Sequence, residues 1–251
     1  MTSSHSIIEI KDLTKSYKNS LAPAINKLNL EIDEGEIFGL LGPNGAGKTT
    51  TISILCGLLK PTEGEIFIKQ YSVKNNINQI KKLIGIVPQD IALYNKLTAR
   101  ENLQYFGRMY DIPRKDLDTR IHTCLEMLGL GKRADDRLDK FSGGMKRRTN
   151  LIAGILHQPE ILFLDEPTVG VDVQSRRVIL DYLFELQKKG TTIIYTSHYL
   201  EEAENFCSQV AFIDNGEIIA KGTPEELTKS GENSFNLEKL FIKLTGRELR
   251  D

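Results

Sequence analysis

The chain has 251 residues, 40% hydrophobic and 27% charged, so it is long enough to bury a sizeable core as one large α/β domain or two small ones. Its net charge of −1 argues against a general nucleic-acid binder, because such proteins usually carry a clear basic excess. The N-terminal residues lack the apolar block of a secretory signal, so none is predicted. No apolar stretch reaches the roughly 18 residues that span a bilayer. Any membrane role is therefore expected to come through a partner.

The first ninety residues are predicted to contain several short strands and one helix. Residues 7–17 and 25–32 show the alternation of half-exposed strands, and Leu28, Leu30 and Ile32 share one face of the second. Further strands are expected over residues 36–41, 65–69 and 83–87, and a helix over residues 50–59.

The sequence GPNGAGKTT fits the phosphate-binding pattern G-x-x-x-x-G-K-[ST] and lies between a predicted strand and a predicted helix. The first helical turn leaves N–H groups without partners, and glycines let the backbone approach an anion closely. Lys48 is expected to reach the terminal phosphates, and the Thr49 hydroxyl to ligate Mg²⁺. The predicted phosphate-binding residues are Gly42, Pro43, Asn44, Gly45, Ala46, Gly47, Lys48, Thr49 and Thr50.

Residues 90–157 are predicted to be helical and inserted between two strands of the sheet. Thr98 and Glu101 form a capping box, and helices are expected over residues 116–128 and from Ser142 to about residue 157. The segment Phe-Ser-Gly-Gly at the start of the last helix offers a second potential anion site. Taken alone, an ordinary serine N-cap accounts for it better.

Strands return after residue 160. Residues 161–164 are uniformly apolar, which is typical of a central parallel strand. A hairpin turning at Asn215-Gly216 and a capping box at Thr223 are expected near the end of the chain. The remaining predicted elements are helix 173–188, strand 191–196, helix 198–207 and helix 236–245.

Two carboxylates follow the buried strand over residues 161–164 directly. Ligands bind past the carboxyl ends of strands in open parallel sheets, so Asp165 is a candidate Mg²⁺ ligand, direct or through water. Glu166 is a candidate to orient or deprotonate a water molecule. Taken alone, a solvated Asp-Glu pair is an equally good interpretation. Gln89 and His198 also follow strands, and Tyr17 fits either core packing or a stacking platform for a base.

In this order, the motifs resemble those of the ATPase subunits of ATP-binding-cassette (ABC) transporters. Phe141 to Met145 is similar to the family's signature motif, usually Leu-Ser-Gly-Gly-Gln. Phe141 and Met145 depart from that pattern, and the resulting Ser-Gly-Gly-Met-Lys-Arg-Arg is similar to the version in exporters of drugs, antibiotics, lipids or polysaccharides. The other matches are Gly42–Thr49 with Walker A, Gln89 with the Q-loop, residues 161–166 with Walker B and its catalytic glutamate, residues 169–172 with the D-loop, His198 with the switch histidine and Tyr17 with the adenine-stacking aromatic.

The resemblance implies an α/β fold, a P-loop NTPase (RecA-like) core with an antiparallel β-subdomain and an inserted helical subdomain. Residues 1–251 would form a single ABC ATPase domain. Its parts would be a catalytic core with the β-subdomain over 1–89 and 158–222, a helical subdomain over 90–157 and a C-terminal helical tail over 223–251.

The resemblance also implies a mechanism. Two copies would dimerise head to tail, with ATP between the Walker A motif of one copy and Ser142, Gly143 and Gly144 of the other. A separate transmembrane permease subunit, contacted near residues 90–110, would hold the dimer on the cytoplasmic face of the cell membrane, and no nucleic-acid partner is expected. The implied metal ligands are Thr49, Gln89 and Asp165, and the implied catalytic residues are Glu166, His198, Gln89 and Lys48.

Two alternatives remain open at this point. A soluble ABC ATPase acting in translation or DNA repair usually carries two cassettes or a long coiled-coil insertion, and this chain has neither. A P-loop GTPase or small-molecule kinase would lack the Ser-Gly-Gly motif and the long helical insertion after Gln89, and a GTPase would carry an Asn-Lys-x-Asp motif that is absent here.

Overall fold

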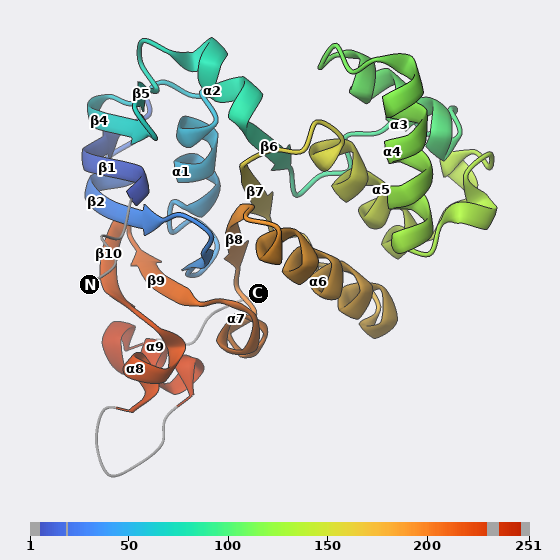
Figure 1. Ribbon diagram of the computed structural model, residues 1–251. Helices are drawn as coiled ribbons and strands as arrows, with labels where there is room; N and C mark the ends of the chain where they lie inside the picture. Colours follow the sequence, from blue (N-terminus) through green and yellow to red (C-terminus); the bar gives the residue numbers. More distant parts are fainter. Residues whose placement is uncertain (1–5, 19, 230–235, 247–251) are drawn as a thin grey trace. The chain divides into compact units, whose positions relative to one another are not determined.

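The computed structural model describes residues 6–18, 20–229 and 236–246 (Figure 1). The chain divides into two compact units, one made of Met1–Lys81 with Thr192–Asp251 and the other of Lys82–Thr191. The finer subdomain boundaries stay a prediction, and part of the predicted C-terminal tail lies outside the described residues.

The first unit contains an antiparallel sheet in the order β2-β1-β4-β5. In the middle of this sheet, Ile10 lies opposite Leu30 on one side and Ile66 on the other. Leu28, Leu30 and Ile32 are all buried, so the predicted apolar face of the second strand is confirmed. The strands are β1 (Ser6–Lys15), β2 (Ile25–Asp33), β4 (Glu63–Ile68) and β5 (Tyr71–Ser72).

The first unit also contains a parallel group of strands in which β3 pairs with both β8 and β9. Every residue of β3 is buried, as a central strand requires. Strands β9 and β10 form the predicted hairpin, and Asn215 (φ 48°) and Gly216 (φ 79°) both have the positive φ of a type I′ turn. The elements are β3 (Ile37–Leu41), α1 (Lys48–Leu55), β8 (Thr192–Ser197), α7 (Leu200–Phe206), β9 (Gln209–Asp214), β10 (Glu217–Gly222), α8 (Pro224–Thr228) and α9 (Leu237–Thr245).

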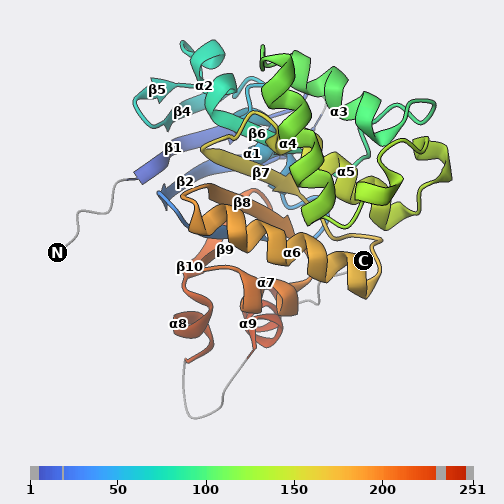
Figure 2. The same cartoon turned by 45° about the vertical axis from the view of Figure 1, so that its right-hand side comes forward.

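The second unit is built around two neighbouring parallel strands, β6 and β7, which lie side by side in Figure 2. The helices between them in sequence confirm the predicted helical insertion, and a Cβ on Gly85 of β6 would lie 2.3 Å from the Gly154 oxygen of α5. Glycine is therefore what lets this helix lie so close to the strand. The elements are β6 (Ile84–Val87), α3 (Ala99–Arg108), α4 (Arg114–Met127), α5 (Gly143–Ile155), β7 (Ile161–Asp165) and α6 (Val173–Lys188), with short 3-10 turns at Gly131–Arg133 and Leu138–Lys140, while α2 (Ile77–Leu83) spans the division between the units.

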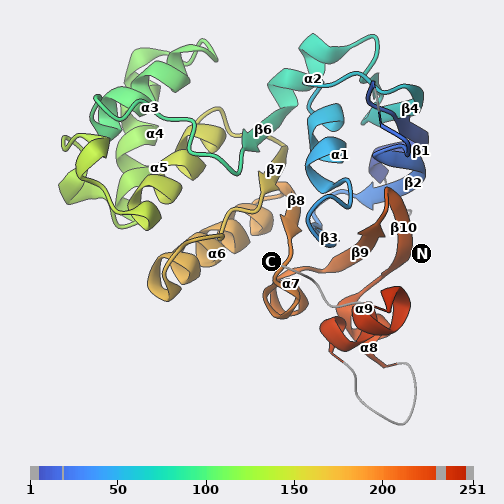
Figure 3. The same ribbon diagram turned by 180° about the vertical axis from the view of Figure 1, so that it is seen from behind.

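Helices α1, α7 and α9 show how the structure departs from the simple sequence pattern. Helix α1 ends at Leu55 because Gly57 adopts a left-handed φ of 69°, where a helix terminates readily. His198 precedes α7 instead of opening it. In α9, which lies beside α8 (Figure 3), Leu237 and Phe241 are buried but Leu244 is 46% exposed, so the buried apolar face does not extend to the last turn of this helix. Among the described residues, no helix combines the length and apolar character needed to cross a bilayer.

Candidate functional site

The loop between β3 and α1 depends on glycine at several positions. A Cβ on Gly42 would lie 2.2 Å from the Ile213 carbonyl oxygen, and one on Gly47 would lie 2.7 Å from the Ala24 oxygen. Gly45 and Gly47 also have positive φ, at 82° and 111°, which other residues adopt only with strain. Along the loop, Asn44, Gly45 and Thr49 are exposed, Pro43 and Thr50 are half-buried, and Gly42, Ala46, Gly47 and Lys48 are buried.

Lys48 is the buried cation of this loop. Its side chain is only 5% exposed, and its Nζ donates hydrogen bonds to the carbonyl oxygens of Gly42 at 2.8 Å and Pro43 at 3.1 Å. The ammonium group is thus held against the backbone of the loop at the N-terminus of α1. Partial positive charge from the helix adds to the lysine charge there, so the loop is suited to bind an anion.

Tyr17 lies next to this loop. Its hydroxyl is 3.4 Å from Thr50 Oγ1, and the Lys15 ammonium lies 5.3 Å from the centre of its ring. The ring is 44% exposed, so core packing, the alternative interpretation of Tyr17, is wrong. An exposed aromatic ring beside a phosphate loop is available to stack on a base.

His198 follows β8, the parallel neighbour of β3. The last residues of the two strands, Leu41 and Ser197, lie opposite each other, so the chain leaves both strands at the same edge. Ser197 Oγ accepts a hydrogen bond from the Tyr199 amide at 2.8 Å, and the His198 ring packs against the Tyr199 ring with centres 4.2 Å apart. Within the first unit, Tyr17 therefore lies beside the loop, and His198 follows the strand that is paired with the one before the loop.

The second unit brings Gln89 and Glu166 together. Val87 of β6 lies opposite Leu164 of β7, so both following segments leave the sheet at one edge. Gln89 Nε2 donates a hydrogen bond to Glu166 Oε2 at 3.3 Å. Asp165 and Glu166 are 6% and 5% exposed, which excludes the interpretation that they are a solvated pair at a strand end.

Glu166 also has an unusual backbone conformation. Its φ is 48°, in the left-handed region that costs a non-glycine residue about 1–3 kcal/mol. The turn is closed by a hydrogen bond from the Val169 amide to the Glu166 carbonyl oxygen at 3.3 Å. Residues held in such conformations occur preferentially at active sites. The sequence contains no signal for this strain, because glutamate is not enriched at positive φ.

Ser142 caps α5, as predicted, and its Oγ accepts a hydrogen bond from the Met145 amide at 3.3 Å. Ser142 and Gly143 are exposed, whereas Gly144 is buried. A Cβ on Gly144 would lie 2.4 Å from Ser175 Oγ and would also crowd Asp172, the N-cap of α6. Hydrogen bonding from Ser175 holds the pKa of Asp172 below its usual value. The exposed N-terminus of α5 is thus seated firmly on α6.

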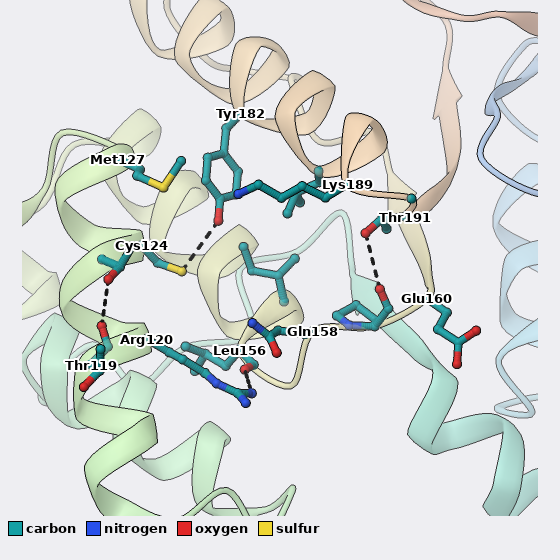
Figure 4. A pocket seen from close by; sticks show the side chains of 15 residues that line it. Thr119, Arg120, Cys124, Met127, Leu156, Gln158, Glu160, Tyr182, Lys189 and Thr191 are labelled. Carbon is teal, nitrogen blue, oxygen red and sulfur yellow. Dashed lines mark hydrogen bonds between the residues drawn. The ribbon is translucent and has the colours of Figure 1, made fainter.

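A separate cavity of about 490 Å³ lies among α4, the end of α5 and the second half of α6 (Figure 4). Cys124 Sγ lies 3.6 Å from the Tyr182 hydroxyl in this cavity, and Arg120 Nη1 donates to the Leu156 oxygen at 2.8 Å. Its lining includes the cation of Lys189 and the carboxylate of Glu160, so the charges of the cavity favour neither an anionic nor a cationic ligand. None of the predicted site residues lines it.

Comparison with known proteins identifies the family. Residues 25–169, more than half of the chain, match the family described as ABC transporter. The chain belongs to the ABC transporter family. It is an ATP-binding subunit, as the sequence motifs predict, and this membership excludes the alternative of a GTPase or small-molecule kinase.

The relatives agree with that membership. The linearmycin resistance ATP-binding protein of Bacillus subtilis (strain 168) is 45% identical over 221 residues, which cover 88% of this chain and 70% of that protein. A solved dimer of the ATP-binding cassette MJ0796, bound to ADP and Pi after hydrolysis, is 28% identical with a TM-score of 0.79 and covers 86% of this chain and 98% of that one. The cbiO1 protein of Clostridium perfringens, part of the ABC transporter complex cbiONQ, is 27% identical with a TM-score of 0.81 and covers 95% and 93%.

These matches confirm the predicted fold class, a P-loop NTPase with antiparallel and parallel sheets. They also confirm ATP as the family's nucleotide. They give no support to the alternative of a soluble ATPase acting in translation or DNA repair.

Sequence reasoning missed two residues that contact the segment around Gln89. Arg147 and Asn150 of α5 are 6% and 3% exposed, and both contact the backbone around Gln89. The sequence shows Arg147 only as part of a basic run at the start of the helix. Their three-residue spacing, together with Leu151, places them on one buried face, and that spacing is the signal that would have found them.

Proposed function

We propose that this chain hydrolyses ATP as the energy-supplying subunit of an exporter. The observation that carries the proposal is the buried, backbone-strained Glu166 in hydrogen-bond contact with Gln89. A carboxylate in that position is suited to take a proton from an attacking water molecule. Export is supported by the resistance protein that the chain resembles, and by the Ser-Gly-Gly-Met-Lys-Arg-Arg form of the signature motif.

In this proposal, the reaction is in-line attack of water on the γ-phosphate of ATP. The loop amides and Lys48 hold the phosphates and offset the developing negative charge, and His198 contacts the γ-phosphate. Glu166 accepts the proton of the water. Tyr17 stacks on the adenine base, consistent with its exposed ring beside the loop.

Mg²⁺ is the proposed metal cofactor, and the available donors fit its preferences. Mg²⁺ binds hard oxygen ligands and is usually held by one or two carboxylates together with phosphate oxygens and water. A hydroxyl from Thr49, an amide oxygen from Gln89 and a carboxylate from Asp165 are donors of this kind. The ion would supply charge stabilisation to the transferring phosphoryl group.

A second copy of the chain is proposed to complete the site with Ser142, Gly143 and Gly144. Ser142 and Gly143 are exposed at the N-terminus of α5, where helix amides and the dipole favour an anion. The related cassette MJ0796 is dimeric in its ADP-bound structure. Because one chain has a single phosphate-loop lysine, a head-to-tail pair would give two equivalent sites.

The proposed transmembrane partner would bind the aromatic surface of the second unit. Tyr94, Tyr105 and Phe106 form a ring cluster in which Tyr105 lies 5.2 Å from Tyr94 and 5.4 Å from Phe106. A hollow of about 530 Å³ beside it is lined by Leu97, Tyr105 and Met109, among others. Such a surface suits the apolar face of a short helix, and it falls within the predicted contact region of residues 90–110.

The backbone under this surface is held by Asn102, a fully buried residue of α3. Its Oδ1 accepts a hydrogen bond from the Tyr94 amide at 2.8 Å, and its Nδ2 donates to the Tyr94 oxygen at 3.1 Å. The backbone that carries the Tyr94 ring is therefore held in place by α3. With the permease bound there, the chain would lie on the cytoplasmic face of the cell membrane. The cargo would belong to the drug, antibiotic, lipid or polysaccharide class.

The test combines nucleotide selectivity, reaction order and membrane association. The purified chain is expected to bind ATP more tightly than GTP, and its ATPase rate per chain is expected to rise with protein concentration as dimers form. The tagged chain is also expected to co-purify with a membrane protein rich in transmembrane helices, and a Tyr105→Ala, Met109→Ala variant to lose that partner while keeping basal ATPase. Absence of hydrolysis at any concentration would overturn the enzymatic proposal, and recovery of ribosomes or DNA instead of a membrane protein would overturn the transport proposal.

A further inference from the structure

Arg147 is a buried cation that contacts the segment leaving β6. It lies on α5, is 6% exposed, and donates from Nη1 to the Pro88 carbonyl oxygen at 3.0 Å. That carbonyl belongs to the peptide bond between Pro88 and Gln89. The guanidinium group therefore fixes the backbone directly before the side chain that meets Glu166.

Asn150, three residues further along α5, holds the same segment at a second point. Its Nδ2 donates to the Pro88 oxygen at 3.4 Å, and its Oδ1 accepts from the Ala92 amide at 3.3 Å. The bonds from Arg147 and Asn150 thus secure the chain on both sides of Gln89. No regular secondary structure is present between Pro88 and Ala92, so these side chains supply the hydrogen bonds that a helix or strand would otherwise provide.

The buried charge of Arg147 interacts with three carboxylates. Burial lowers the pKa of its guanidinium, while the carboxylates of Asp90, Glu166 and Asp165 attract the charge and oppose that effect. Burying a cation is costly unless it is paired and hydrogen-bonded, and an apolar residue at such a site is often neutral or stabilising. Packing alone therefore does not explain an arginine at this position.

We propose that Arg147 is a positioning residue which, with Asn150, fixes Gln89 against Glu166 and ties both to the helix that begins at Ser142. Because Ser142 is the N-cap of α5 and Arg147 lies in its second turn, the group offered to a second copy and the residue that holds the Gln89 segment belong to one helix. The inference rests on the proposed function and adds to it a residue that touches neither nucleotide nor metal.

The experiment compares Arg147→Met and Arg147→Lys with a matched control, Arg120→Met. Arg120 also donates a guanidinium hydrogen bond to a carbonyl oxygen of the α5 segment, that of Leu156 at 2.8 Å, but at the opposite end of the helix. Loss of that bond tests the general effect of removing an arginine–carbonyl contact. The lysine variant keeps the positive charge but lacks the planar guanidinium group. It is measured in place of the methionine variant if the latter does not fold.

Three readouts are measured for each variant: the dissociation constant for ATP, kcat, and hydrogen exchange of the 88–92 segment without nucleotide. For Arg147→Met we expect unchanged ATP affinity, kcat lowered about 10- to 100-fold as misplaced catalytic groups produce, and several-fold faster exchange at Ala92. Arg147→Lys is expected to recover part of kcat. Arg120→Met is expected to leave kcat and exchange of this segment unchanged.

Equal kcat values for Arg147→Met and Arg120→Met would overturn the inference, and so would a parallel loss of affinity and kcat that follows the melting temperature. Failure of the proposed function has a different signature, because the wild-type chain would then hydrolyse no ATP. The exchange measurement needs no nucleotide, so it still decides whether Arg147 holds the segment. Unchanged exchange in both Arg147 variants would reject that role.

Discussion

Gln89 and Glu166 are joined by a hydrogen bond of 3.3 Å between Nε2 and Oε2 although 77 positions separate them in the sequence. Each follows one of two neighbouring parallel strands, in which Val87 lies opposite Leu164. The register of β6 and β7 therefore decides which side chains meet. A slip of one residue in either strand would turn the side chains of that strand to the opposite face and change which side chains meet.

Glu166→Gln is expected to keep ATP binding and to lower hydrolysis by about 10²-fold or more, because an amide cannot act as a general base. ATP affinity and single-turnover hydrolysis are the measurements. Glu185→Gln is the matched control, since Glu185 is an exposed carboxylate of the same unit that bonds only to Lys188 among the contacts described. Near-normal turnover in Glu166→Gln would remove Glu166 from its proposed role.

Ser142→Arg is expected to block ATPase activity without unfolding the monomer. Ser142 is exposed at a helix N-terminus, so a long cation there would obstruct a second copy but would cost the chain only about 1 kcal/mol through loss of the cap. Thr223→Arg removes a comparable cap from α8 and controls for that loss. The measurements are ATPase rate and melting temperature. An unchanged ATPase rate in Ser142→Arg would contradict the proposal that a second copy completes the site.

Tyr17→Ala is expected to weaken ATP binding about tenfold, as removal of a base-stacking ring worth about 1–2 kcal/mol would do. Tyr17→Phe keeps the ring but removes the hydroxyl near Thr50, so it should bind nearly normally. Inorganic tripolyphosphate has no base and provides the internal control. If Tyr17→Ala weakened tripolyphosphate binding as much as ATP binding, the residue would be supporting the loop instead of stacking on adenine.

Gly144→Ala is expected to lower the free energy of unfolding by about 1–3 kcal/mol, because the new methyl group would overlap Ser175 Oγ at 2.4 Å. Gly143→Ala is the matched comparison, since its Cβ would meet only the Gly170 oxygen at 3.9 Å, and its effect should stay within about 1 kcal/mol. Denaturant unfolding of both variants checks this difference. Equal stabilities would show that α5 and α6 are less tightly packed than described.

Cys124 is expected to react with a maleimide before the other two cysteines, because it is half-buried while Cys56 and Cys207 are buried. Burial raises the pKa of the Cys124 thiol, so a smaller fraction is thiolate at a given pH than for an ordinary thiol, and labelling should accelerate as the pH rises. The Tyr182 hydroxyl opposes that rise in pKa. Tyr182→Phe should therefore slow labelling at a given pH, and mass spectrometry of labelled peptides measures both effects.

Much of the site could be predicted from sequence because its residues follow directly from short, strongly patterned strands. The phosphate loop, Gln89, Asp165 and His198 each come just after an apolar run, and the parallel pairs β3–β8 and β6–β7 bring the ends of such runs together. Apolar periodicity and glycine chemistry are local signals, and they predict the strand ends that these residues follow.

The rest depends on tertiary contacts that local pattern does not encode. The left-handed φ of Glu166 follows from the turn that closes on it, and glutamate gives no sign of it. In the sequence, Arg147 belongs to a run of three basic residues, a pattern typical of a solvated helix face. In the structure it is buried against the Pro88 carbonyl oxygen. The sequence pattern predicts a helix that continues to residue 59, because apolar residues flank Gly57 on both sides. In the structure α1 ends at Leu55, and Gly57 has a left-handed φ.

The paired hydrogen bonds between Asn102 and Tyr94 have a mechanical consequence. Both backbone groups of Tyr94 are bonded to one buried side-chain amide, that of Asn102, which is the fourth residue after the Thr98 cap of α3. Also, Asn102 Nδ2 donates to the Thr98 carbonyl oxygen at 2.9 Å. A force applied at Tyr94 would therefore pass through the Asn102 side chain to the first turn of α3 and would not stay in the Tyr94 loop.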